Sequence, residues 1–195
     1  MKEPSDGAPD GFIAARAHFA TAAEAARGAI KGELAIYPRE PGDHYDRTAL
    51  AALRTGDLFA FRATGDRRTV LTGFAAPDGI AVPTPGLIDA LRKGKAIAQD
   101  EPGLARLFAA AKLGTDEAMS YADVLQRLKF LFHDAVVDRL CPLRADGDAV
   151  QVRWSLSVGE GAPAKGITRT RTTWLTARYD RAAGTVRLTS GDEGC

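Results

Sequence analysis

The stretch AVQVRWSLSV, residues 149–158, decides the fold of the second half of this chain. Apolar and polar side chains alternate along it, with valine, tryptophan and leucine at the even-numbered positions and glutamine, arginine and serine between them. Successive side chains of a β-strand point to opposite faces, so this alternation buries one face and leaves the other in water. The pattern predicts a half-buried strand of an antiparallel sheet.

Two further strands are predicted after this stretch. A loop rich in glycine and proline, residues 159–166, leads to a second strand over 167–179. A turn at 180–184 then leads to a third strand over 185–190. Because short connections join strands in the antiparallel sense, the sequence predicts a three-stranded C-terminal meander.

Helical spacing of apolar residues predicts about five helices upstream of the meander. Asp10 is the expected N-cap of the first helix, and Ser120 with Asp123 resembles a capping box at the start of the last. That last helix carries one broad apolar face and is expected to form the spine of the core. The five predicted segments are 10–27, 46–54, 84–94, 102–114 and 120–140.

A hairpin is predicted in the first half of the chain, where strands over 58–63 and 69–74 flank the polar connection 64–68. We therefore expect an α+β fold in which an antiparallel sheet, the C-terminal three-strand meander plus an N-terminal hairpin, packs against about five helices. Residues 1–10 are predicted to be a disordered arm and residues 11–195 a single α+β domain. Separate subdomains for the two hairpin regions are the alternative.

Composition and charge argue against several classes of function. Hydrophobic residues make up 45% and charged residues 26% of the 195-residue chain, which is typical of a folded, soluble protein. With 26 basic against 25 acidic side chains, the formal net charge is +1, so no overall field attracts nucleic acid or an anionic membrane. No apolar stretch approaches the roughly 18 residues that a transmembrane helix needs. Nucleic acid is therefore not an expected partner, and no transmembrane segment is predicted.

The first residues and the cysteines bear on the compartment. The segment MKEPSDGAPDGF lacks the apolar core of a signal peptide, which makes the cytoplasm the default. The periplasm or cell envelope is the alternative if an export signal has been removed. Cys141 and Cys195 are compatible with one disulfide, and two separate reduced thiols are the other interpretation. The many Ala, Arg and Gly residues suggest a bacterial source.

Histidine and aspartate residues supply the candidates for a metal-assisted enzyme. The glycine-rich phosphate loop, GxSxG, paired CxxC and HExxH signatures are absent, so no cofactor is predicted and enzymatic activity stays an open question. The alternative function is a metal-assisted hydrolase using His44 and Asp46, in a proline-rich loop, with His133 and Asp134 on the last helix. It requires that the loop fold against that helix. Capping by Asp46 and a boundary position for His133 explain these residues without a metal, and that interpretation is favoured.

Basic side chains gather in the predicted meander, where residues 149–189 contain seven basic and two acidic side chains. If no bulge intervenes, alternation places Arg169 and Arg171 on the same face as Leu175, where two arginines would line a pocket and could grip a carboxylate or phosphate. A bulge, or extension of the strand past the packed area, would return them to water. The candidate ligand-binding residues are Arg153, Arg169, Arg171, Arg178 and Arg187.

These observations favour a non-catalytic bacterial binding or interaction protein. Its Arg/Thr-rich sheet face is expected to contact a small anionic ligand or a protein partner, with an affinity that falls at high salt. A third arrangement is an architecture in which helices on a curved sheet enclose a pocket, as in cystatin-like or nuclear-transport-factor-like proteins. This is an analogy of architecture only, because no residue pattern in the sequence identifies either family.

Overall fold

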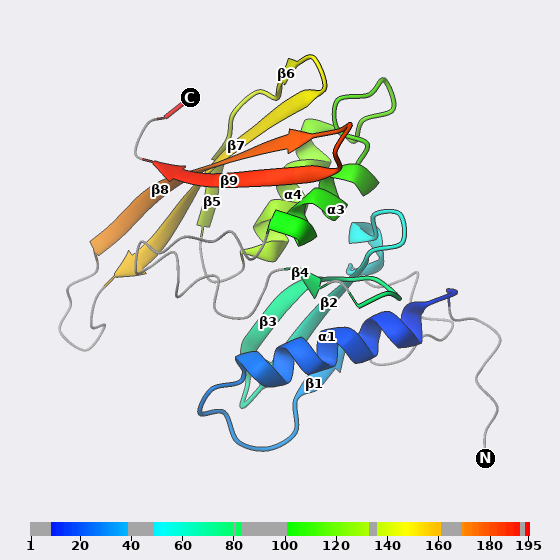
Figure 1. Ribbon diagram of the computed structural model, residues 1–195. Coiled ribbons are helices and arrows are strands. Elements are labelled where there is room, and N and C mark those ends of the chain that lie inside the picture. Colours follow the sequence, from blue (N-terminus) through cyan, green and yellow to red (C-terminus); the bar gives the residue numbers. More distant parts are fainter. Residues whose placement is uncertain are drawn as a thin grey trace. The chain divides into compact units, whose positions relative to one another are not determined.

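The chain divides into two compact units, Met1–Gly86 and Leu87–Cys195, and each unit is described by itself (Figure 1). The expectation of a single domain over 11–195 stays a prediction. The computed structural model describes these residues: 9–38, 49–79, 81–82, 101–132, 136–160, 169–191 and 194–195. Most of the predicted N-terminal arm and the whole of the predicted helix 84–94 lie outside this set.

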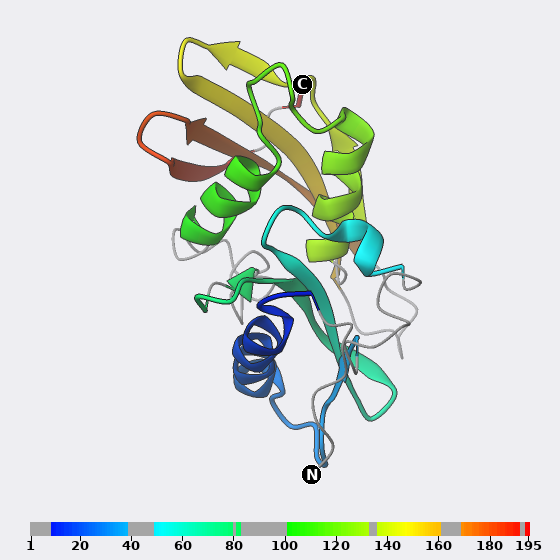
Figure 2. The same cartoon turned by 90° about the vertical axis from the view of Figure 1, so that its right-hand side faces the viewer.

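The first unit consists of one helix on an antiparallel sheet. The helix is α1 (Phe12–Ala26), and the strands follow the order β1-β2-β3-β4. Helix α1 lies along one face of this sheet in both views (Figures 1 and 2). Phe12 and Phe19 of the helix contact Phe61 of the sheet, with ring centroids 5.4 and 5.3 Å apart. The strands are β1 (Ala35–Tyr37), β2 (Phe59–Gly65), β3 (Arg68–Ala75) and β4 (Ala81–Val82).

Local backbone geometry corrects three predictions in this unit. The N-cap of α1 is Gly11 with φ 81°, not Asp10, because the chain enters the helix in a left-handed conformation that glycine adopts without strain. The hairpin turn is shorter than the predicted 64–68: only Asp66 and Arg67 connect β2 to β3, with φ 49° and 61°, as in the primed turns that match strand twist. Instead of a helix over 46–54, the described residues form a single 3-10 turn, η2 (Ala51–Leu53).

The second unit is an antiparallel sheet with two helices against one of its faces. The strand order is β5-β7-β8-β9, and the short β6 also pairs with β7. The three-stranded C-terminal meander is confirmed as β7, β8 and β9. The elements are α3 (Glu101–Ala110), α4 (Tyr121–Leu131), β5 (Val136–Leu140), β6 (Arg144–Asp146), β7 (Ala149–Glu160), β8 (Arg169–Asp180) and β9 (Thr185–Gly191).

Helices α3 and α4 lie against one face of the meander (Figures 1 and 2), and the buried apolar side chains of β7 and β8 belong to that face. Phe108 of α3 lies edge-on to Tyr179 of β8, with ring centroids 6.0 Å apart. Phe132, just after α4, contacts Trp154 of β7, again at 6.0 Å. The even-numbered apolar positions of β7 from Val150 to Leu156 are almost completely buried, which confirms the alternation predicted for this strand.

The long helix predicted over 120–140 is wrong in its second half. Its start is confirmed, because the Ser120 hydroxyl accepts a hydrogen bond from the Asp123 backbone N–H at 3.2 Å. Helix α4 ends at Leu131, however, and the residues from Val136 onward form β5, where Val136 pairs with Ser157 of β7. β-Branched residues favour a strand once a neighbouring strand is available to pair with them. The spine of this unit is therefore β7, not a helix.

The overall class is confirmed as α+β with antiparallel sheets, but the expected helix count is not. The described residues contain three α-helices and one 3-10 turn rather than about five helices. No helix in the described part of the chain is long and apolar enough to cross a membrane.

Candidate functional site

The candidate site is the face of the second unit's sheet that lies opposite α3 and α4, called here the outer face. Because side chains alternate along each strand, the residues between the buried ones point to this side. On β7 these include Gln151, Arg153 and the buried Ser155, and on β8 they include Trp174, Thr176 and Arg178. The outer face is therefore polar, with one aromatic ring.

Three arginines and a glutamine form one row across four strands of the outer face. Strand register pairs Arg144 of β6 with Gln151 of β7, Gln151 with Arg178 of β8, and Arg178 with Arg187 of β9. Adjacent strands lie about 4.8 Å apart, so this arginine row spans about 14 Å. Arg144, Arg178 and Arg187 are exposed.

Arg178 and Arg187 occupy directly opposed positions, which is an unfavourable arrangement for the fold. Like charges opposite each other on neighbouring strands destabilise a sheet. Neither side chain forms an ion pair or side-chain hydrogen bond with any residue that the structure describes. The packing of the unit therefore gives no reason for this pair of positive charges.

The two arginines line a cleft of about 650 Å³ at the edge of the sheet. Two carboxylates also line it, but both accept hydrogen bonds from backbone amides. Glu101 accepts from the N–H of Leu188 at 2.8 Å, and Asp180 accepts from the N–H of Ala183 at 2.9 Å. The cleft residues are Glu101, Pro102, Ala105, Arg178, Asp180, Gly184, Thr185, Val186 and Arg187.

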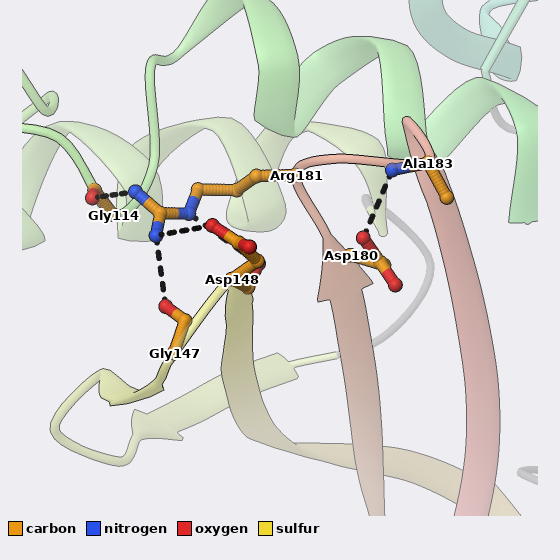
Figure 3. A network of polar contacts seen from close by, with 6 residues as sticks. All are labelled: Gly114, Gly147, Asp148, Asp180, Arg181 and Ala183. Carbon is orange, nitrogen blue, oxygen red and sulfur yellow. Dashed lines mark hydrogen bonds and ion pairs between the residues drawn. The ribbon is translucent and has the colours of Figure 1, made fainter.

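Arg181 belongs to the same basic stretch of sequence but has a structural role, shown in Figure 3. Its guanidinium donates to the carbonyl oxygen of Gly147 at 2.8 Å and to the carboxylate of Asp148 at 3.2 Å. A third bond reaches the carbonyl oxygen of Gly114, in the connection between α3 and α4. Arg181 therefore ties together two turns of the sheet and the loop between the helices.

Arg127 is a second arginine with a role in packing. It is 6% exposed on α4, and its Nη1 donates to the backbone carbonyl of Asp123 at 3.0 Å. Burial lowers the pKa of the Arg127 guanidinium, while the negative charge of Asp123 raises it. Since an arginine side chain stays protonated in proteins, Arg127 carries its charge inside the unit.

A smaller pocket lies on the outer face beside the disulfide. Cys141 and Cys195 are bonded, with their Cα atoms 5.6 Å apart, so of the two interpretations of these cysteines the disulfide is the one found. The Arg153 guanidinium lies over the Trp174 ring, 5.8 Å from its centroid. Gly194 lies against the same ring, since a Cβ placed there would be 3.7 Å from Cζ2 of Trp174. The pocket has a volume of about 80 Å³ and is lined by Cys141, Pro142, Arg144, Gln151, Arg153 and Cys195.

The five predicted ligand-binding arginines divide between two sets of register positions. Arg153, Arg178 and Arg187 belong to the outer face. β8 pairs with β7 from Arg169 to Asp180 without a register shift, so Arg169 and Arg171 share the strand parity of Leu175, as expected in the absence of a bulge. Their side chains lie outside the described residues.

Sequence reasoning missed Arg144 and Gln151 as site residues. Arg144 was missed because β6 was not predicted. The two residues between β6 and β7, Gly147 and Asp148, are a Gly-Asp pair, which is a hairpin signal and could have revealed the extra strand. Gln151 was missed because its position in the arginine row depends on that strand.

The residues of the alternative metal site are outside the part of the chain that the structure describes: His44, Asp46, His133 and Asp134. Asp138, which lies within the helix predicted over 120–140, belongs to strand β5. Among the described residues there is no group of three or more side chains that could hold a metal ion. The metal-assisted hydrolase stays a prediction.

Comparisons of the chain with protein-family models, with curated proteins and with solved structures found no match.

Proposed function

We propose that this protein is a non-catalytic binding protein whose outer face holds an anionic group, a carboxylate or phosphate, of a ligand or protein partner. The observation that carries the proposal is the exposed pair Arg178 and Arg187, opposed across β8 and β9 at the wall of a cleft. An anion placed between them would receive donors from two guanidinium groups and would relieve their mutual repulsion.

The chemistry of arginine favours this class of ligand. The planar guanidinium group presents paired N–H donors that match carboxylate and phosphate oxygens, and charge-assisted bonds of this kind are the stronger hydrogen bonds of proteins. The negative charges of Glu101 and Asp180 oppose an anion in the cleft, but these carboxylates accept from backbone amides and form no described ion pair with Arg178 or Arg187, so both guanidinium groups keep their donors. Since the site is open to water, salt should weaken the binding.

The test is a titration with pyrophosphate at low salt, followed by the amide NMR shifts of β8 and β9. We expect shifts centred on Arg178 and Arg187, and a double substitution R178Q/R187Q that weakens binding at least about tenfold, equivalent to about 1.4 kcal/mol. The matched control is R62Q/R68Q, which removes two exposed strand arginines from the first unit and the same net charge.

Two results would contradict the proposal. Equal weakening in R178Q/R187Q and R62Q/R68Q would show that only net charge matters. An absence of pyrophosphate binding to the unmodified protein at low salt would remove the anion site itself.

A further inference from the structure

The arginine row continues beyond the cleft to a second set of anion-binding groups. Arg144 is exposed, forms no ion pair or side-chain hydrogen bond with another described residue, and lines the 80 Å³ pocket. Arg153 lines the same pocket, and its guanidinium is positioned over Trp174. Because a water molecule occupies about 30 Å³ in the liquid, this pocket has room for one carboxylate or phosphate group and little more.

The disulfide gives this pocket a fixed wall. Cys141 and Cys195 both line it, and the backbone N–H of Cys141 donates to the carbonyl oxygen of Arg153 at 2.7 Å. The chain that carries Arg153 is therefore joined to the bonded cysteines by a direct hydrogen bond. Because this wall is held in place, Arg153 lies in a preorganised pocket, and a preorganised site loses less conformational freedom on binding than a mobile surface arginine does.

The two sites are connected along the row. Gln151 lines the small pocket and is the register partner of Arg178, which lines the cleft. One site lies over β6 and β7 and the other over β8 and β9, so their centres are two strand spacings, or about 10 Å, apart.

Charge also sets the direction in which a ligand would cross the sheet. The neighbouring row on the same face contains Asp146 and Asp180, two residues along from Arg144 and Arg178. These carboxylates repel an anionic chain that runs along the strands. The row on the other side contains Arg153 and Thr176 and carries no such repulsion.

We propose that the outer face holds two anion subsites, one formed by Arg178 and Arg187 and the other by Arg144 and Arg153. Its ligand is a linear molecule with anionic groups about 10 Å apart that crosses the strands along the arginine row. This rests on the proposed function and narrows it from an anion to an extended di- or polyanion.

The experiment compares alkane bisphosphonates with different linkers: methylene, butane and octane. The octane linker spans the two subsites and the methylene linker does not, so octane-bisphosphonate is expected to bind the full chain at least tenfold more tightly than methylene-bisphosphonate. In R144Q this gain disappears, while methylene-bisphosphonate still shifts the amide NMR signals of β8 and β9, because Arg178 and Arg187 are unchanged. Those shifts also show that the variant is folded. R68Q, which removes one exposed strand arginine from the first unit, is the control and should keep the gain.

The outcomes separate the two proposals. If all linkers bind equally and R178Q/R187Q weakens them all, there is one subsite, and the two-subsite proposal is overturned while the proposed function stands. If the octane linker gains affinity equally in R144Q and in the unmodified protein, the gain comes from elsewhere and the second subsite is again excluded. If no bisphosphonate binds, both proposals fail.

Discussion

Arginines that look alike in the sequence have different roles in the structure. Arg178, Arg181 and Arg187 lie within ten residues of each other, yet only Arg181 is held by hydrogen bonds to other described residues. Charge counting could predict a basic stretch but not this division, because the partners of Arg181 come from turns that are distant in the chain.

Substituting Arg181 should therefore destabilise the second unit. R181Q loses donors to Gly147, Asp148 and Gly114, and we expect the free energy of unfolding to fall by about 1–2 kcal/mol. Urea denaturation followed by circular dichroism measures it. R178Q is the control, because its side chain has no described partner to lose. An equal loss of stability in both variants would contradict the assigned roles.

Gly114 is a position where both the backbone and the surroundings require glycine. Its φ is +80°, and a Cβ would lie 2.5 Å from Cγ2 of Val150. G114A should lower the free energy of unfolding by about 2 kcal/mol or more, from left-handed strain and overpacking together. Gly147, with φ +58° and open space around it, is the matched control. If G147A costs as much as G114A in thermal unfolding, the close approach to Val150 has no energetic role.

Strict alternation of apolar and polar residues made the strands of the meander predictable from sequence, whereas the boundary between α4 and β5 could not be predicted. Leu131 and Phe132 fit the helical spacing of α4, and the same spacing extends to Val136 and Leu140. Pairing with β7, which is distant in sequence, decides the conformation of Val136 and Leu140. The arginine row was only partly predictable for the same reason. It depends on how four strands pair with one another, and the sequence of a single strand does not determine that register.

Glu101 links helix α3 to the edge strand β9 and also places a negative charge in the cleft. In E101Q the amide oxygen can still accept the hydrogen bond of the Leu188 N–H, while the charge is removed. We expect E101Q to bind pyrophosphate a few-fold more tightly and E101A to lose about 1 kcal/mol of stability that E101Q keeps. Calorimetric titration and urea denaturation measure the two effects. Weaker pyrophosphate binding in E101Q would be evidence against an anion in this cleft.

The disulfide constrains only the second unit. Cys141 and Cys195 are 54 residues apart in sequence, and both belong to Leu87–Cys195. The even number of cysteines was enough to suggest a disulfide. That Cys141 and Cys195 lie close together could not be predicted, because their distance depends on the pairing of β8 with both β7 and β9.

Removing the disulfide should destabilise the second unit selectively. For a loop of this length, the chain-entropy model gives a loss of about 4 kcal/mol in C141S/C195S. Hydrogen exchange should show faster opening of β7, β8 and β9 and unchanged opening of α1, β2 and β3. Reductant should act on the unmodified protein and leave the double variant unaffected. Uniform acceleration across both units would show that they unfold as one.

We propose that Arg178 and Arg187 serve a ligand and not the fold, and the free energy of unfolding of R187Q distinguishes these two roles. Removing one of two opposed positive charges should raise this free energy by a few tenths to about 1 kcal/mol in the absence of ligand, while pyrophosphate binding weakens. A lower free energy of unfolding in R187Q would show that the arginine stabilises the sheet, and it would contradict the assignment of this face as an anion-binding site.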